Sequence, residues 1–228
     1  MMKRELLFIS IFSLGLISAQ QKVEKKEAIK GDSAQTVSVK KYHPNFTIGI
    51  DVLHLGAIPF GNQKMIQGYI STRFRDKIHL VADIGFDKNK YQKNGYDAEA
   101  DGFFIKAGAL YMMASDPENH DNGFYVGGKL AASLYNQTYH SVPIRWIQGQ
   151  DSYTSFPKSS QSAYWIEAAI GGRIQLQGTR IFIDAQVQPK YLMYTTKQEE
   201  IVPMIIPGFG KNANKFKLGF MWSVAYQF

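Results

Sequence analysis

Apolar and polar side chains alternate along the segment 216–228, FKLGFMWSVAYQF. Large apolar residues occupy every second position from Phe216 to Phe228, and most of the residues between them are small or polar. This period of two is typical of a β-strand with one apolar face. The same pattern predicts seven further strands, at 46–54, 64–75, 78–86, 103–113, 124–135, 164–176 and 180–192. Because no helical apolar period competes with them, the chain is predicted to be all-β.

The predicted strands are long. Most have the ~9–11 residues that a tilted strand needs to cross a bilayer, rather than the ~5–6 that are usual in soluble sheets. The apolar face of these strands holds no charge, as lipid requires, because a charge at mid-membrane costs roughly 2–4 kcal/mol. We therefore predict an eight-stranded antiparallel transmembrane β-barrel whose apolar face points outward.

The opposite face of the strands combines charges of both signs with glycine, alanine and serine. Such a mixture suits the narrow interior of a small barrel. Ten charged residues are predicted to form a network there: Asp51, Arg73, Asp83, Lys106, Lys129, Glu167, Arg173, Asp184, Lys190 and Lys217. We expect this network to be structural, because breaking one partner of a buried ion pair costs ~3–5 kcal/mol. A narrow polar conduit or a small-solute binding barrel is the functional alternative.

The connections between the predicted strands alternate in length. Outer-membrane barrels have short turns on the periplasmic side and longer loops outside. With the N-terminus periplasmic, the long outer loops are 55–63, 87–102, 136–163 and 193–215, and the periplasmic turns are 76–77, 114–123 and 177–179. Aromatic residues also gather at both ends of the strands, as they do at membrane interfaces. A soluble periplasmic lipocalin-like ligand-binding barrel is the alternative, but it does not explain the loop lengths.

The chain is predicted to have three parts. Residues 1–19, MMKRELLFISIFSLGLISA, have the basic start, short apolar run and small final residues of a cleaved signal peptide. Residues 20–45 are polar and lysine-rich, which predicts a flexible basic periplasmic tail. We expect the tail to be a spacer, and a docking segment for a soluble partner or an anionic surface is the alternative. Residues 46–228 form the barrel, and the predicted location is the cell outer membrane.

Composition excludes several classes of protein and site. The chain has no cysteine, which excludes a lipid-anchored lipoprotein, disulfides and thiolate metal sites. Its net charge of +7 is scattered, so no nucleic-acid partner is expected. None of the five histidines lies at metal-ligand spacing or beside a serine and an acid in register. We therefore predict no catalytic, metal-binding or cofactor-binding residue, with a lipid hydrolase or acyltransferase as the enzymatic alternative.

The predicted outer loop 195–215 contains an unusually apolar stretch, IVPMIIPGF (201–209). Apolar surface left in water is unfavourable by ~25 cal/mol per Å², so we expect something to cover it. Either the stretch folds over the barrel mouth as a lid packed on Trp146, Tyr153 and Phe156, or it docks a protein partner. The motif at its centre comprises Ile206, Pro207, Gly208 and Phe209.

Two further patterns carry a resemblance to known proteins. The C-terminal one looks like the signature by which barrel-insertion machinery recognises its substrates, and it comprises Phe220, Trp222, Val224, Tyr226 and Phe228. The stretches YWIEAAIGGRIQL (164–176), IIPGF (205–209) and NKFKLGFMWSVAYQF (214–228) resemble a family of uncharacterised outer-membrane barrels of the Bacteroidetes type. This resemblance implies a barrel in contact with outer-membrane lipid and lends no catalytic residue. We therefore expect a non-enzymatic, structural or interaction role, with loop 195–215 as a candidate docking surface.

Overall fold

The computed structural model describes residues 45–116, 119, 121–146, 149–198 and 201–228. Its elements are β1 (Phe46–Asp51), α2 (Val52–Ala57), η2 (Ile58–Phe60), β2 (Gln63–Arg75), β3 (Ile78–Lys93), β4 (Tyr96–Ser115), β5 (Gly123–Ile144), β6 (Ser152–Gln175), β7 (Ile181–Thr195), β8 (Ile205–Ile206), β9 (Gly210–Lys211) and β10 (Phe216–Gln227). The predicted signal peptide and nearly all of the predicted tail lie outside the described residues.

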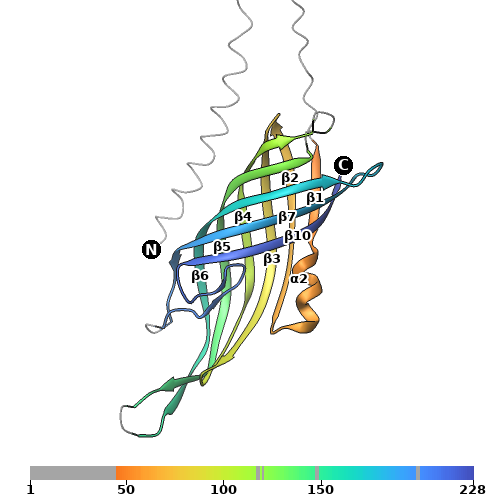
Figure 1. Cartoon of the computed structure of the whole chain (residues 1–228). Coiled ribbons are helices and arrows are strands. Elements are labelled where there is room, and N and C mark those ends of the chain that lie inside the picture. The colour runs from red at the N-terminus through yellow and green to blue at the C-terminus, as the bar shows by residue number, and fades with distance from the viewer. Residues whose placement is uncertain (1–44, 117–118, 120, 147–148, 199–200) are drawn as a thin grey trace, which may run out of the picture. The chain divides into compact units, whose positions relative to one another are not determined.

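Eight long strands form one closed barrel, in the order β1, β10, β7, β6, β5, β4, β3, β2 (Figure 1). All neighbouring strands pair antiparallel, and β1 closes the ring by pairing with both β2 and β10. The short strands β8 and β9 form a separate hairpin in the connection between β7 and β10. The predicted fold of eight antiparallel strands is confirmed.

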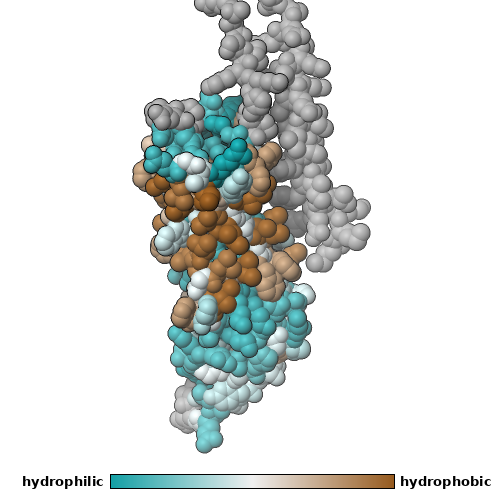
Figure 2. Space-filling model, turned by 90° about the vertical axis from the view of Figure 1, so that its right-hand side faces the viewer, coloured by the Kyte–Doolittle hydropathy of each residue, from teal (hydrophilic) through white to brown (hydrophobic). Residues whose placement is uncertain are grey.

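An apolar belt surrounds the outside of the barrel. Its exposed side chains include Ile66, Ile84, Leu130, Ile170 and Phe220, which come from five different strands. Figure 2 shows this belt as a brown band between two hydrophilic ends. Water penalises such a surface, whereas lipid does not. The barrel is therefore of the membrane-spanning kind, and the lipocalin-like alternative is wrong because it places the apolar face inside.

Two of the predicted outer loops are wrong, because most of their residues belong to strands. β3 runs to Lys93 and β4 begins at Tyr96, so the turn consists of Asn94 and Gly95, with φ of 55° and 84°. Asn-Gly is the residue pair that a tight hairpin turn favours. β5 and β6 likewise extend through most of the predicted loop 136–163. We call the end of the barrel with these projecting hairpins the hairpin end, and the opposite end the turn end (Figure 1).

The first predicted strand, 46–54, is wrong at its end. β1 stops at Asp51, whose carboxylate accepts hydrogen bonds from the backbone N–H groups of Leu53 (3.0 Å) and His54 (3.3 Å). A side chain that satisfies the first turn in this way begins a helix, so α2 follows. The alternation concealed this change, because an aspartate suits both a lumen-facing strand position and a helix N-cap. Within the described ranges, no helix is long and apolar enough to cross a membrane.

Candidate functional site: the filled barrel interior

The turn-end half of the interior contains a buried ion pair beside a second cluster of apolar side chains. Arg173 Nε lies 2.9 Å from Asp184 Oδ2, and the β6–β7 register places these two residues opposite each other. The hydroxyls of Tyr69 and Tyr125 donate to the same carboxylate, at 3.3 and 2.5 Å. The Arg173 guanidinium also lies over the Tyr69 ring. Charge-assisted hydrogen bonds therefore compensate for the burial of both charges.

Two more ion-paired groups lie further along the lumen. Lys129 Nζ is 2.7 Å from Asp83 Oδ2. Glu167 Oε2 is 3.0 Å from Lys106 Nζ and 3.9 Å from Lys190 Nζ. All five side chains are buried. Each buried charge faces an opposite charge, which is the arrangement that makes its burial tolerable.

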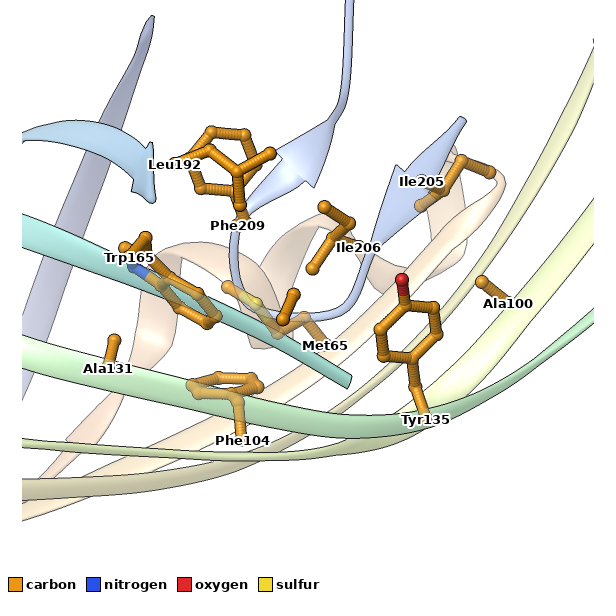
Figure 3. Close-up of a cluster of buried hydrophobic side chains, with 11 residues drawn as sticks. Met65, Ala100, Phe104, Ala131, Tyr135, Trp165, Leu192, Ile205, Ile206 and Phe209 are labelled. Atoms are coloured by element: carbon orange, nitrogen blue, oxygen red, sulfur yellow. The ribbon is translucent and has the colours of Figure 1, made fainter. Parts of the chain in front are cut away.

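The hairpin-end half of the interior is filled by a loop instead. A segment of the β7–β10 connection enters the lumen, and we call residues 201–211 the inserted loop. Its apolar side chains pack on side chains from the barrel wall (Figure 3). The resulting cluster comprises Met65, Ala100, Phe104, Ala131, Tyr135, Ala163, Trp165, Leu192, Ile205, Ile206 and Phe209. The rings of Phe209 and Trp165 meet edge to face, with centroids 5.8 Å apart.

Gly208 anchors the inserted loop to the wall. Lys190 Nζ donates to the Gly208 carbonyl at 2.8 Å, and the Gly208 N–H donates to Asp87 Oδ2 at 3.2 Å. The φ of Gly208 is +77°, and a Cβ there would lie 2.4 Å from the Phe104 ring. Glycine alone satisfies both the backbone angle and the available space. The backbone of Gly208 is thus held by one cationic side chain, Lys190, and one anionic side chain, Asp87.

The ten predicted interior charges are distributed unevenly. Seven of them form the three ion-paired groups described above. Asp51 instead caps α2, and its Oδ2 lies 2.6 Å from His54 Nδ1. Arg73 and Lys217 are half-buried, and neither has an ion pair with any residue that the structure describes. Gln186 links two of these groups, because its Oε1 accepts a hydrogen bond from Lys129 Nζ at 3.5 Å and its Nε2 donates to the Tyr125 hydroxyl at 3.3 Å.

The predicted position of the Ile206–Phe209 motif is wrong, because the motif lies inside the barrel and not over its mouth. Ile206 and Phe209 are 0% and 2% exposed, so these side chains are not available to a partner. The predicted lid contacts are also wrong in part, since Trp146 and Tyr153 are 64% and 61% exposed. Insertion into the lumen buries these apolar residues on all sides, whereas a lid over the mouth would leave one of its faces in water.

Sequence reasoning missed Asp87, which lies in the predicted loop 87–102. Its side chain is fully buried and accepts hydrogen bonds from Gly208 and from Gln63 Nε2, the latter at 3.0 Å. The sequence pattern did contain a signal for the inward position of Asp87. The inward-facing alternation that begins at His79 and includes Asp83 continues without interruption to Asp87.

Asp121 is a second residue that sequence reasoning missed, within a predicted turn. Its Oδ1 lies 3.6 Å from His79 Nε2 at the turn end, and its Oδ2 accepts a hydrogen bond from Gln227 at 2.6 Å. Because it lies between strands, no alternation indicated its inward position. Among the residues that the structure places, no three histidines or carboxylates are arranged to hold a metal ion.

The residues of the predicted insertion signature lie at alternate positions along β10 and at Phe228. Their side chains are exposed on the apolar outside of the barrel. They have the orientation that lipid contact requires. Recognition by barrel-insertion machinery stays a prediction.

A closed ring of eight antiparallel strands, an apolar outer belt and a filled lumen define a membrane-spanning β-barrel protein. The chain belongs to the family described as a domain of unknown function (DUF6048), whose sequence model matches residues 4–228. The predicted membership of an uncharacterised family is confirmed, and its Bacteroidetes origin stays a prediction. No curated protein matches the chain in sequence.

Several solved outer-membrane barrels are similar in fold. The N-terminal β-barrel domain of Pseudomonas aeruginosa OprF is 12% identical, with 81% of this chain and 97% of that chain covered and a TM-score of 0.35. A major outer membrane protein from Thermus thermophilus is 10% identical, with coverages of 82% and 100% and a TM-score of 0.44. The attachment invasion locus protein Ail of Yersinia pestis is 12% identical, with coverages of 81% and 97% and a TM-score of 0.42.

Proposed function

We propose that this protein is an outer-membrane barrel with a closed interior and a non-enzymatic, structural or interaction role. The observation that carries this proposal is the inserted loop, which occupies the hairpin-end half of the lumen. Ion-paired side chains and a second apolar cluster occupy much of the remainder. The interior of an eight-stranded barrel is only wide enough for side chains to fill. These observations support a barrel that does not pass solutes.

The outer membrane is the proposed location. Aromatic side chains border the apolar belt at both of its edges, which is typical of barrels in that membrane. Phe86 and Phe103 meet edge to face toward the hairpin end, with centroids 4.9 Å apart. The rings of Tyr226 and Phe228 also meet edge to face, at the turn end, with centroids 4.9 Å apart. In this orientation the hairpin end lies outside the cell and the turn end faces the periplasm.

The projecting β5–β6 hairpin is the proposed interaction surface. Ile144, Trp146 and Tyr153 are exposed near its tip. Clustered apolar side chains in water mark sites of interaction. The hairpin is braced near its base, where the rings of Tyr139 and Phe156 meet edge to face at 6.1 Å. This surface replaces the one predicted on 195–215, because the key apolar residues of that loop are buried.

Ion conductance in planar lipid bilayers tests the closed interior. The purified wild-type barrel is expected to show no current above leak. A variant whose residues 203–211 are replaced by a glycine-serine linker of equal length is expected to conduct, because its lumen loses the apolar filling. A hairpin variant, Trp146→Ser, serves as the control and should stay closed. A steady current through the wild-type protein would contradict the proposal and favour the narrow-conduit alternative.

A further inference from the structure

The barrel wall is interrupted at the hairpin end between β2 and β10. β1 ends at Asp51, which pairs with Ser223, so the part of β10 at 216–222 has no strand beside it on that edge. Residues 63–67 of β2 likewise have no strand beside them on the edge that faces β10. The short helix α2 lies in this gap and contacts both strands (Figure 1). We call this interruption the seam.

A polar crevice of about 250 Å³ lies at the seam. His54 and Lys217 line it at the wall, and Lys190 and Gly208 line it within. Gly219 keeps it open, because a Cβ at that position would approach Lys190 Cε to 2.8 Å. The crevice therefore extends from the lipid-facing wall to the anchor of the inserted loop.

The crevice lies at the depth of lipid headgroups. Lys217 pairs in register with Lys190, and the next pair toward the hairpin end joins Phe216 to Tyr191. Both of these aromatic side chains are exposed at the edge of the apolar belt. Aromatic residues in this position mark the interface between hydrocarbon and headgroups.

An apolar groove lies beside the crevice on the lipid-facing surface. It has a volume of about 540 Å³ and shares Leu53 and Phe220 with the crevice. Val187, Ile170 and Trp222 line its further course. A polar site at headgroup depth thus joins an apolar groove at the depth of acyl chains.

The charge of the crevice favours an anion. Its lining includes His54, Lys190 and Lys217 but no carboxylate. Asp51 pairs with His54, and Glu167 faces Lys190. Lys217 has no such partner among the described residues, so its charge is available to a ligand.

We propose that the seam binds one anionic lipid of the outer leaflet. The headgroup phosphate enters the crevice and contacts Lys217, and an acyl chain follows the groove past Phe220. A membrane lipid fits better than free phosphate, because an apolar groove adjoins the crevice at Leu53 and Phe220 and a free ion would leave that groove empty. The site goes beyond the closed-barrel role, and its assignment to the outer leaflet rests on the proposed orientation of the barrel.

Native mass spectrometry of the full-length barrel tests this site. The protein is incubated with equal amounts of dioleoylphosphatidylglycerol and dioleoylphosphatidylcholine, and the retained lipid is identified. We expect one phosphatidylglycerol per barrel, and we expect Lys217→Gln to lower its retention about fivefold, as removal of one basic residue near anionic lipid does. Lys158→Gln removes the same charge from the exposed β6 extension and should have no effect, and Lys217→Arg should retain the lipid.

Two further measurements complete the test. Gly219→Leu should abolish retention by filling the crevice, and heat-modifiable migration on gels checks that this variant folds. Excess inorganic phosphate should not displace the lipid. Equal retention of both lipids, equal effects of Lys217→Gln and Lys158→Gln, or displacement by phosphate would each overturn the proposal.

Discussion

The two halves of the barrel interior are filled in different ways. At the turn end, charged side chains of neighbouring strands face each other, as Arg173 and Asp184 do in the β6–β7 register. At the hairpin end, an apolar loop enters the lumen and packs on the wall. Strand register places Arg173 opposite Asp184, whereas Lys129 and Asp83 come from strands that are not neighbours and meet across the lumen. The inserted loop additionally requires a positive φ and two charged anchors at Gly208.

This difference indicates that the two halves respond to different kinds of substitution. The turn-end half should be most sensitive to the loss of one charge, because the remaining charge is then buried without a partner. The hairpin-end half should be most sensitive to changes in shape, because the side chains around the inserted loop are closely packed. The predictions below test this contrast.

Arg173→Met is expected to have the largest effect. It leaves the Asp184 carboxylate buried without its cation, which typically lowers the free energy of unfolding by ~3–5 kcal/mol. Urea unfolding in detergent micelles, followed by tryptophan fluorescence, measures this loss. Arg75→Met removes an exposed arginine and is the control.

The double variant Arg173→Met with Asp184→Leu sharpens this prediction. It removes both charges, so most of the lost stability should return. A single Arg173→Met variant as stable as Arg75→Met would contradict the sensitivity of the turn-end half to the loss of one charge.

Gly208→Ala is expected to lower the free energy of unfolding by roughly 3 kcal/mol. The alanine Cβ adds strain at positive φ and meets the Phe104 ring, and these effects cost ~1–2 and ~1–3 kcal/mol. Gly178→Ala is a matched control, since Gly178 also has a positive φ (+72°) but nothing lies within 4 Å of its added Cβ. The same urea titration compares them, and equal losses would show that the loop does not pack on Phe104.

Ile206→Val is expected to cost about 1 kcal/mol, because it removes one buried methylene from the apolar cluster. Ile144→Val makes the same change at an exposed position of the β5–β6 hairpin and should cost close to nothing. Thermal unfolding of both variants measures the difference. Two unchanged melting temperatures would indicate that Ile206 lies outside the lumen.

The smallest expected effect lies outside the barrel interior, in the β3–β4 hairpin. Lys88 Nζ lies 2.6 Å from Glu99 Oε1, and this hydrogen bond holds the pKa of the Glu99 carboxyl below its ordinary value. A carboxyl with a lowered folded-state pKa stabilises the protein above its unfolded pKa, and this contribution is lost as the pH falls through the folded pKa. Glu99→Gln should therefore be slightly less stable than wild type at pH 7, and this difference should become smaller as the pH is lowered to 3.

The matched control for that pH dependence is Asp97→Asn. Asp97 lies in the same hairpin and accepts a hydrogen bond from the neutral side chain of Gln92, at 3.3 Å. Thermal unfolding at both pH values compares the two variants. A Glu99→Gln deficit of the same size at pH 7 and pH 3 would show that the ion pair is not its cause.

Alternation along the chain was sufficient to predict the barrel and the direction of its faces. It determines which side chains share a face, because successive residues of a strand point to opposite sides. The pattern alone therefore assigns Lys129 and Glu167 to the lumen. The same rule extends to Asp87, which was missed because the strand was predicted to end at residue 86, whereas β3 continues to Lys93.

How the apolar segment 201–209 is covered depends on the closed barrel. The sequence showed that its side chains need cover, but a lid, a partner and the lumen satisfy that need equally well. Ala100, Ala131 and Ala163 belong to the wall around the inserted loop, and their small side chains leave the space that it fills. These residues come from three different strands. The space exists only once the strands have closed, which is why local sequence patterns do not contain it.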